Sequence, residues 1–157
     1  MLTDMQKQTL KAAILADPVL AALPLNSDGN YEIAAALNLP ATPAFVVWQS
    51  QLTPEKSRQA IVAGSEQLDN LTVGKRDALL YLAGGTLDCR QANVRSAIDN
   101  LCGTQNTLKA SLVAAQKRTA SRVEQILATG TGSDASPAVT TFEGTISYQD
   151  VGVARAS

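Results

Sequence analysis

The residues that could do chemistry are few, and their types restrict the chemistry that is open to the chain. Histidine, the commonest general base and metal ligand, is absent from the 157 residues. Cys89 and Cys102 lie 13 positions apart, a spacing that matches no zinc or redox motif. We expect two buried free thiols, with a disulfide across a helix as the alternative. The sequence therefore predicts that the protein is not an enzyme and holds no metal or cofactor.

The glycine-rich segment Gly130–Asp134 (GTGSD) resembles a phosphate-binding loop only superficially. Phosphate loops follow a strand and open a helix, and in the P-loop a lysine follows the glycines. Here the expected order is helix, loop and strand, and no lysine follows. The segment is therefore predicted to end a helix and to begin a linker.

Acidic side chains give a second candidate for chemistry. Asp77 and Asp99, with Arg95 nearby in the sequence, could in principle do acid–base work. On short amphipathic helices, however, such charges more often form a solvated or salt-bridged face. The 13 basic and 14 acidic residues of the chain are interspersed and give a net charge of −1. A duplex-binding protein usually shows a concentrated positive surface, which this charge pattern does not indicate.

The densest basic stretch, Gln116–Arg122, is predicted to lie on a long helix. Lys117, Arg118 and Arg122 would then share one face. They are expected to be ordinary solvent-exposed side chains, and the alternative is a docking surface for an acidic partner or for DNA. Trp48, the single tryptophan, is expected to anchor a core or an interface rather than to line a ligand pocket.

The elements that must position these residues are expected to be helices. Cap signals at Thr3, Thr53 and Thr72 precede apolar residues at helical spacing, and Gly103 and Gly130 are placed to end helices. The first expected helix starts at Thr3, and a short helical turn follows over Pro18–Leu23. Further helices are expected from Ser27 or Asp28 to Leu37, from Thr53 to about Ala63, from Thr72 to Ala83, over Asp88–Cys102, and from Thr104 to about Thr129.

The composition also indicates a small helical domain. Apolar residues make up 45% of the chain and aromatic residues only 4%, so the core should consist of Ala, Leu, Val and Ile. The segment Ala44–Ser50 (AFVVWQS) fits either a short strand or a helical turn, and we favour helix. We therefore predict an all-α fold, with a small bundle of five to six helices in residues 1–129, a flexible linker at 130–137 and an extended C-terminal arm at 138–157. The polar N-terminus and the lack of a long apolar run predict an intracellular protein that does not contact a membrane.

The arm is predicted to contain a β-strand from Ala138 to about Val151 (AVTTFEGTISYQDV). Its β-branched and aromatic content is high and its charge is low, unlike a disordered tail, which is the alternative. A strand exposes unpaired N–H and C=O groups, and a helical body offers no ladder for them. We therefore expect the strand to complete a sheet in another chain. The predicted partner-binding residues are Val139, Phe142, Gly144, Ile146, Tyr148 and Val151.

Four stretches that span nearly the whole chain carry a resemblance to a known group of proteins. They are AAILADPVLAALPLNSDGNYEIAAALN, LDNLTVGKRDALL, ANVRSAID and LATGTGSDASPAVTTFEGTISYQDV. Together they resemble small structural proteins of tailed bacteriophages, in particular head-to-tail connector proteins, the adaptor or neck component below the portal. The resemblance implies a virion structural protein whose helical body forms a homo-oligomeric ring, commonly of twelve copies.

The same resemblance implies partners and a location. The arm would lock the ring to the portal protein or to neighbouring subunits, and tail or nozzle proteins would follow below. DNA would pass through the channel of the ring without sequence-specific binding. The protein would be made in the cytoplasm of the host bacterium and reside at the head–tail junction of the virion. The alternatives are another phage ring or decoration protein, for tail completion or capsid stabilisation, and a cytoplasmic helical interaction module with a disordered tail.

Overall fold

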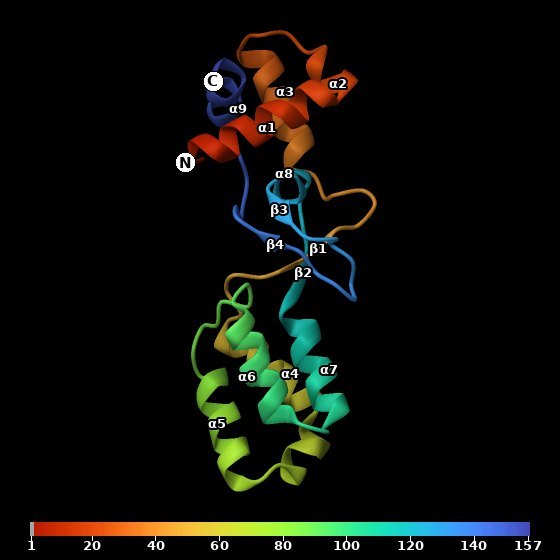
Figure 1. Ribbon diagram of the computed structural model, residues 1–157, viewed down its shortest axis with the longest axis vertical. Coiled ribbons are helices and arrows are strands. Elements are labelled where there is room, and N and C mark those ends of the chain that lie inside the picture. Colours follow the sequence, from red (N-terminus) through yellow and green to blue (C-terminus); the bar gives the residue numbers. More distant parts are fainter. Residues whose placement is uncertain (1) are drawn as a thin grey trace. The chain divides into compact units, whose positions relative to one another are not determined.

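The computed structural model describes residues 2–157 and is mostly helical, as predicted, with 58% helix and 10% strand. The expected count of five to six helices is wrong, because the described residues form nine α-helices, one 3₁₀ helix and two small two-stranded sheets. The chain divides into two compact units (Figure 1). Unit 1 combines the residues up to Val47 with Thr119–Ser157, and unit 2 is Trp48–Arg118. The predicted single body at 1–129 is therefore wrong.

Unit 1 begins with helices whose ends follow the predicted cap signals. Helix α1 (Asp4–Ala16) starts at a capping box, in which the Thr3 backbone N–H donates to Gln6 Oε1 at 2.8 Å. Asp17 ends α1 and caps the short α2 (Pro18–Ala21), because its carboxylate accepts from the Val19 backbone N–H at 2.8 Å. These contacts satisfy N–H groups that a helix start leaves without intrahelical partners.

Helices α3 (Ser27–Asn38), α8 (Arg122–Ile126) and α9 (Tyr148–Ala156) complete the helical part of unit 1. Asn26 caps α3, one residue before the predicted cap. In Figure 1 the red α1 lies beside the blue α9, and α9 packs on both α1 and α3. The core of unit 1 therefore joins residues from the two ends of the described chain: Leu2, Leu10, Ile14, Leu20, Ile33, Ala34, Leu37, Val123, Leu127, Ile146, Val151 and Ala154.

A small sheet lies in the same unit. Strand β3 (Ala128–Thr129) pairs antiparallel with β4 (Val139–Thr140). The segment between them, predicted as a linker at 130–137, is the connection of this pair. It is tied to the unit where the Val46 backbone N–H donates to the Gly132 carbonyl oxygen at 2.7 Å. Gly132 has φ +68°, and a Cβ there would lie 2.1 Å from the Phe45 ring, so this close approach requires glycine.

Two further sequence predictions are wrong for the same physical reason. The segment Ala44–Ser50, for which we favoured helix, contains strand β1 (Val46–Trp48), which pairs with β2 (Lys117–Thr119). Strand β2 interrupts the long helix predicted from Thr104 to about Thr129, so that helix α7 (Asn106–Ala115) ends before it. Pairing between segments about 70 residues apart overrides local helical periodicity, which carries no information on distant partners.

Unit 2 is a group of short helices, and its caps at Thr53 and Thr72 confirm the predicted starts. Its elements besides α7 are α4 (Pro54–Ala63), the 3₁₀ helix η1 (Ser65–Asn70), α5 (Val73–Ala83) and α6 (Ala92–Cys102). They enclose a core of Ala60, Ile61, Leu71, Leu79, Ala83, Ile98, Cys102, Leu108 and Leu112. Cys89 and Cys102 are buried free thiols, as predicted, and burial raises the pKa of Cys89 to about 11.

Candidate functional site

The C-terminal segment, predicted as an exposed strand, is instead part of the core of unit 1. Only Val139–Thr140 is a strand, and it pairs within the chain. Tyr148–Ala156 is helix α9, with Val151 0% and Ile146 4% exposed. The strand predicted from Ala138 to about Val151, and with it the extended arm, is therefore wrong. Backbone N–H groups that were expected to need a second chain, such as those of Thr141, Gly144 and Ile146, find partners in their own chain.

The stretch between β4 and α9 is held by side chains of unit 1. Asn38 makes a pair of hydrogen bonds with Ile146, because its Nδ2 donates to the Ile146 carbonyl oxygen and its Oδ1 accepts from the Ile146 N–H, both at 2.9 Å. The buried Glu124 accepts from the Gly144 N–H at 2.9 Å. The Asn38 amide group thus pairs with both backbone groups of Ile146, as a neighbouring strand would do in a sheet. This segment is therefore ordered by its own unit.

The structure places the six predicted partner-binding residues in different environments. Ile146 and Val151 are buried core residues, and Phe142 packs partly buried against the same core. Val139 is half-buried in β4, and Gly144 is exposed with φ +115°. Tyr148 is half-buried, and its ring stacks on the exposed Tyr31 with centroids 4.1 Å apart. The set is therefore not one continuous strand face, and only its exposed and half-buried members present surface to a partner.

A local signal for α9 was present in the sequence and was missed. Ser147 and Asp150 form a capping box, in which the Ser147 N–H donates to Asp150 Oδ2 at 3.0 Å and the Asp150 N–H donates to Ser147 Oγ at 3.1 Å. The Ser147 backbone N–H and hydroxyl group both donate to the Asp150 carboxylate, and these two hydrogen bonds lower the pKa of that carboxyl. A Ser and an Asp three positions apart, followed by Val151 and Ala154 on one helical face, predict a helix start.

A hollow of about 400 Å³ opens on the surface of unit 1. We name it the α1 groove. It is lined by α1, the loop before α3 and α9, and its main lining residues are Lys11, Ile14, Leu15, Leu23, Leu25 and Arg155. The floor is apolar, and both ionisable side chains in the lining are basic.

Arg155 is fixed at the edge of the α1 groove by neutral acceptors. Its Nη1 donates to the Pro24 carbonyl oxygen at 2.9 Å and to Asn30 Oδ1 at 2.8 Å, and its Nη2 donates to the Leu23 carbonyl oxygen at 2.7 Å. None of these acceptors is a carboxylate, so its positive charge is not neutralised by an ion pair within the described residues.

Helix α5 of unit 2 carries an exposed apolar face. Tyr81 is 85% exposed, and Leu80 and Val73 are also exposed large apolar residues. Asp77 lies on the same face, since it precedes Tyr81 by four positions and follows Val73 by four. We name these four residues the α5 ridge.

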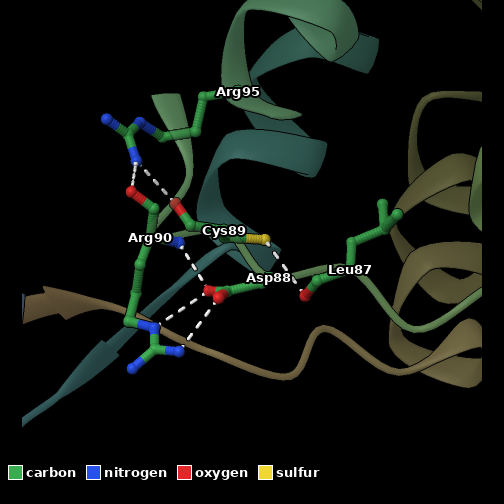
Figure 2. A network of polar contacts seen from close by, with 5 residues as sticks. All are labelled: Leu87, Asp88, Cys89, Arg90 and Arg95. Carbon is green, nitrogen blue, oxygen red and sulfur yellow. Dashed lines mark hydrogen bonds and ion pairs between the residues drawn. The ribbon is translucent and has the colours of Figure 1, made fainter. Parts of the chain in front are cut away.

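A polar network in unit 2 fixes the loop that leads into α6 (Figure 2). Arg95 Nη1 donates to the carbonyl oxygens of Cys89 and Arg90, both at 2.7 Å. Asp88 accepts from the Arg90 backbone N–H at 3.1 Å and from its Nε and Nη2 at 2.9 Å, and these bonds lower the pKa of the Asp88 carboxyl. Figure 2 also shows the Cys89 Sγ directed toward the Leu87 carbonyl oxygen. The network therefore holds this loop in one conformation.

The acidic residues that were considered for acid–base work take up separate roles in unit 2. Asp99 pairs with Lys109, and Asp77 is exposed on the α5 ridge. The guanidinium of Arg95 lies 4.7 Å from the centre of the Trp48 ring, so this tryptophan is a stacking partner within unit 2. The ion pair of Asp99 and the exposure of Asp77 correspond to the salt-bridged or solvated face that the sequence predicts.

The basic stretch does not form the single helical face that was predicted. Lys117 and Arg118 lie in β2 and belong to unit 2, whereas Arg122 opens α8 in unit 1 and pairs with Asp17. The hydrogen bond from Arg122 lowers the pKa of the Asp17 carboxyl. The predicted single helix with one basic face is therefore wrong, and with it the alternative of a docking surface on that face.

Residues 2–157 contain no group of three or more His, Cys, Asp or Glu side chains placed to hold a metal ion. Over the same residues, no helix combines the length and the apolar character needed to span a bilayer. Comparisons with models of known protein families, with curated proteins and with solved structures gave no match.

Proposed function

We propose that the protein is a virion structural protein of a tailed bacteriophage, a head-to-tail connector adaptor that forms a ring below the portal. The proposal rests on the resemblance of the four quoted stretches, which covers both units of the chain. The observation that carries the assembly role is the exposure of large apolar side chains on both units, at Leu15 and Leu25 in unit 1 and at Leu80 and Tyr81 in unit 2. Exposed apolar surface of this kind is typical of proteins that pack against other subunits.

The contact to the portal protein takes a different form from the strand addition expected of a free arm. Because Ile146 and Val151 are core residues, a partner can reach only the outer side of the C-terminal segment. That side offers the stacked Tyr31–Tyr148 pair and the exposed Val153 on α9. Tyrosine is enriched at interfaces because it combines a large apolar ring with a hydroxyl group. We propose that this surface contacts the portal or a neighbouring subunit.

The ring would contain twelve copies, with tail or nozzle proteins below it and the genome in its channel. The net charge of −1 supports a channel that lets DNA pass without sequence-specific binding, because a tight phosphate-binding surface needs concentrated positive charge. No catalytic step is part of this function. The protein would act by assembly alone, and symmetry would multiply a modest contact over many copies.

The test is to prevent synthesis of the protein in the phage that encodes it and to supply it again from a plasmid. We expect heads and tails to accumulate separately without it, and joined particles to return with the plasmid copy. Normal joining of heads and tails in its absence would contradict the connector role. Fragile heads that still carry tails would favour a capsid-stabilising protein instead, and unchanged particles would favour the cytoplasmic interaction module.

A further inference from the structure

The α1 groove of unit 1 has the features of a receptor for an apolar side chain with an acidic neighbour. Its floor consists of Ile14, Leu23 and other apolar residues, and Leu15 is exposed at its edge. Its volume of about 400 Å³ lies within the range of protein pockets that bury a sizeable group. The two ionisable residues of the lining are Lys11 and Arg155. The ammonium of Lys11 donates to an oxygen of Ser157, whereas the guanidinium of Arg155 meets only neutral acceptors. An occupant that supplies a carboxylate together with apolar surface would complement it.

The α5 ridge of unit 2 has the opposite features. Val73, Asp77, Leu80 and Tyr81 follow the spacing i, i+4, i+7 and i+8, which places them on one face of α5. Three of them are exposed large apolar residues. The carboxylate of Asp77 makes no hydrogen bond or ion pair with any residue that the structure describes, and it lies one helical turn before Tyr81. This face therefore presents a carboxylate and an aromatic anchor side by side.

We propose that the α5 ridge of one copy docks into the α1 groove of a second copy. Tyr81 enters the apolar floor, and Asp77 meets the guanidinium of Arg155 at the edge of the groove. An exposed helical face that inserts anchors at i, i+4 and i+7 into an apolar groove is a common mode of recognition. A buried tyrosine at the centre of such a contact is the kind of residue that dominates binding energy.

The proposed contact is heterologous, because groove and ridge are different surfaces and every copy carries one of each. Repetition of a heterologous contact gives a closed ring or an open filament. That this contact builds the ring rests on the proposed connector function. That the α5 ridge binds the α1 groove does not depend on that function. The charge complementarity also favours contact between a ridge and a groove over contact between two ridges. Two ridges would bring the Asp77 carboxylates of both copies together, and like charges repel.

The test uses the full chain and one disabling change in each surface. Leu15→Glu places a carboxylate in the α1 groove, and Tyr81→Ala removes the anchor of the α5 ridge. Met5→Glu is the matched control for the first, because Met5 is an exposed apolar residue of α1 that does not line the groove. Val62→Ala, an exposed residue of α4 outside the ridge, is the control for the second. Far-UV circular dichroism checks that every variant is folded.

Sedimentation velocity over a dilution series measures the association. We expect the wild type and both controls to form species larger than one chain, and each disabling change to weaken association at least about tenfold. A mixture of the Leu15→Glu and Tyr81→Ala proteins retains one intact groove and one intact ridge, so it should form complexes of two chains and no larger ones.

Several results would overturn the contact. They are a wild type that stays monomeric at every concentration, disabling variants that associate as the wild type does, and a mixture that stays monomeric. A protein that joins heads to tails in the phage but stays monomeric in solution would refute this contact and leave the connector role in place. Association that follows the groove and ridge in a protein dispensable for joining would refute the connector role alone.

Discussion

Replacing Val151 by alanine tests whether the C-terminal segment belongs to the core of unit 1. Val151 is fully buried in α9 within the main cluster of that unit. The change removes two methyl groups, which at about 0.8 kcal/mol for each buried carbon accounts for about 1.6 kcal/mol of transfer free energy. The cavity left behind adds to this cost, so we expect the free energy of unfolding of unit 1 to fall by about 2–3 kcal/mol.

Val153→Ala is the matched control, because it makes the same chemical change two positions later in the same helix. Val153 is 53% exposed, and alanine has the higher helix propensity. We therefore expect this variant to lie within about 0.5 kcal/mol of the wild type. The difference between the two variants isolates the effect of burial from the effect on the helix.

Two signals followed during urea unfolding show which of the two units loses stability. Trp48 is the single tryptophan and belongs to unit 2, so its fluorescence reports that unit, whereas far-UV circular dichroism reports the helices of both. Val151→Ala should move the dichroism transition to lower urea and leave the Trp48 transition unchanged. Equal and small effects of Val151→Ala and Val153→Ala would refute the packing described here and would favour a free C-terminal arm.

Three further substitutions test other parts of the structure. Gln116 is 1% exposed and neither polar atom of its side chain has a hydrogen-bond partner, so Gln116→Met should raise the free energy of unfolding by about 1 kcal/mol in urea titrations; a loss of stability would contradict the unpaired state. Gly132→Ala should lower the stability of unit 1 by more than about 1 kcal/mol, because φ is +68° and the new Cβ would meet the Phe45 ring; a neutral result in the same titration would contradict this backbone geometry. The hydrogen bond from Arg122 holds the pKa of Asp17 below its usual value, so the stability it contributes is present above about pH 4 and is lost as the pH falls through the folded-state pKa. Asp17→Asn should therefore reduce the acid-induced loss of unfolding free energy measured from pH 5 to pH 2, and an unchanged pH profile would contradict the interaction.

The helix starts of this fold could be predicted from the sequence because their causes are local. Thr3, Thr53 and Thr72 each accept a hydrogen bond from a backbone N–H three positions later. Such a contact depends on four residues and leaves a recognisable pattern. The buried free thiols could also be predicted, because the spacing of Cys89 and Cys102 fits no motif and cysteine is usually buried.

The strands could not be predicted, because their partners are distant in the sequence. The segment around Val46–Trp48 fits a strand as well as a helix, but nothing in it identifies Lys117–Thr119 as its partner, and a two- or three-residue strand carries almost no periodicity. The division into two units follows from the same pairs of distant segments, since unit 1 is built from both ends of the chain.

The candidate site was misjudged through composition. The threonines at 140, 141 and 145 and the neighbouring aromatic residues have strand propensity, but propensity describes a half-buried surface rather than a backbone state. In the structure Thr140 is buried, and the hydroxyl group of Thr141 donates to the Leu127 carbonyl oxygen at 2.9 Å. The capping signal at Ser147 and Asp150 was the better guide, because it describes a specific set of hydrogen bonds.

The most direct test of the proposed connector role is the position of this protein in the particle. Fab fragments raised against the folded protein would be bound to purified virions and imaged by electron microscopy, with particles from the complemented knock-out as the matched sample. We predict label at one site in each particle, at the junction between head and tail. Label over the capsid faces or along the tail, or no label on particles that contain both head and tail, would contradict the account.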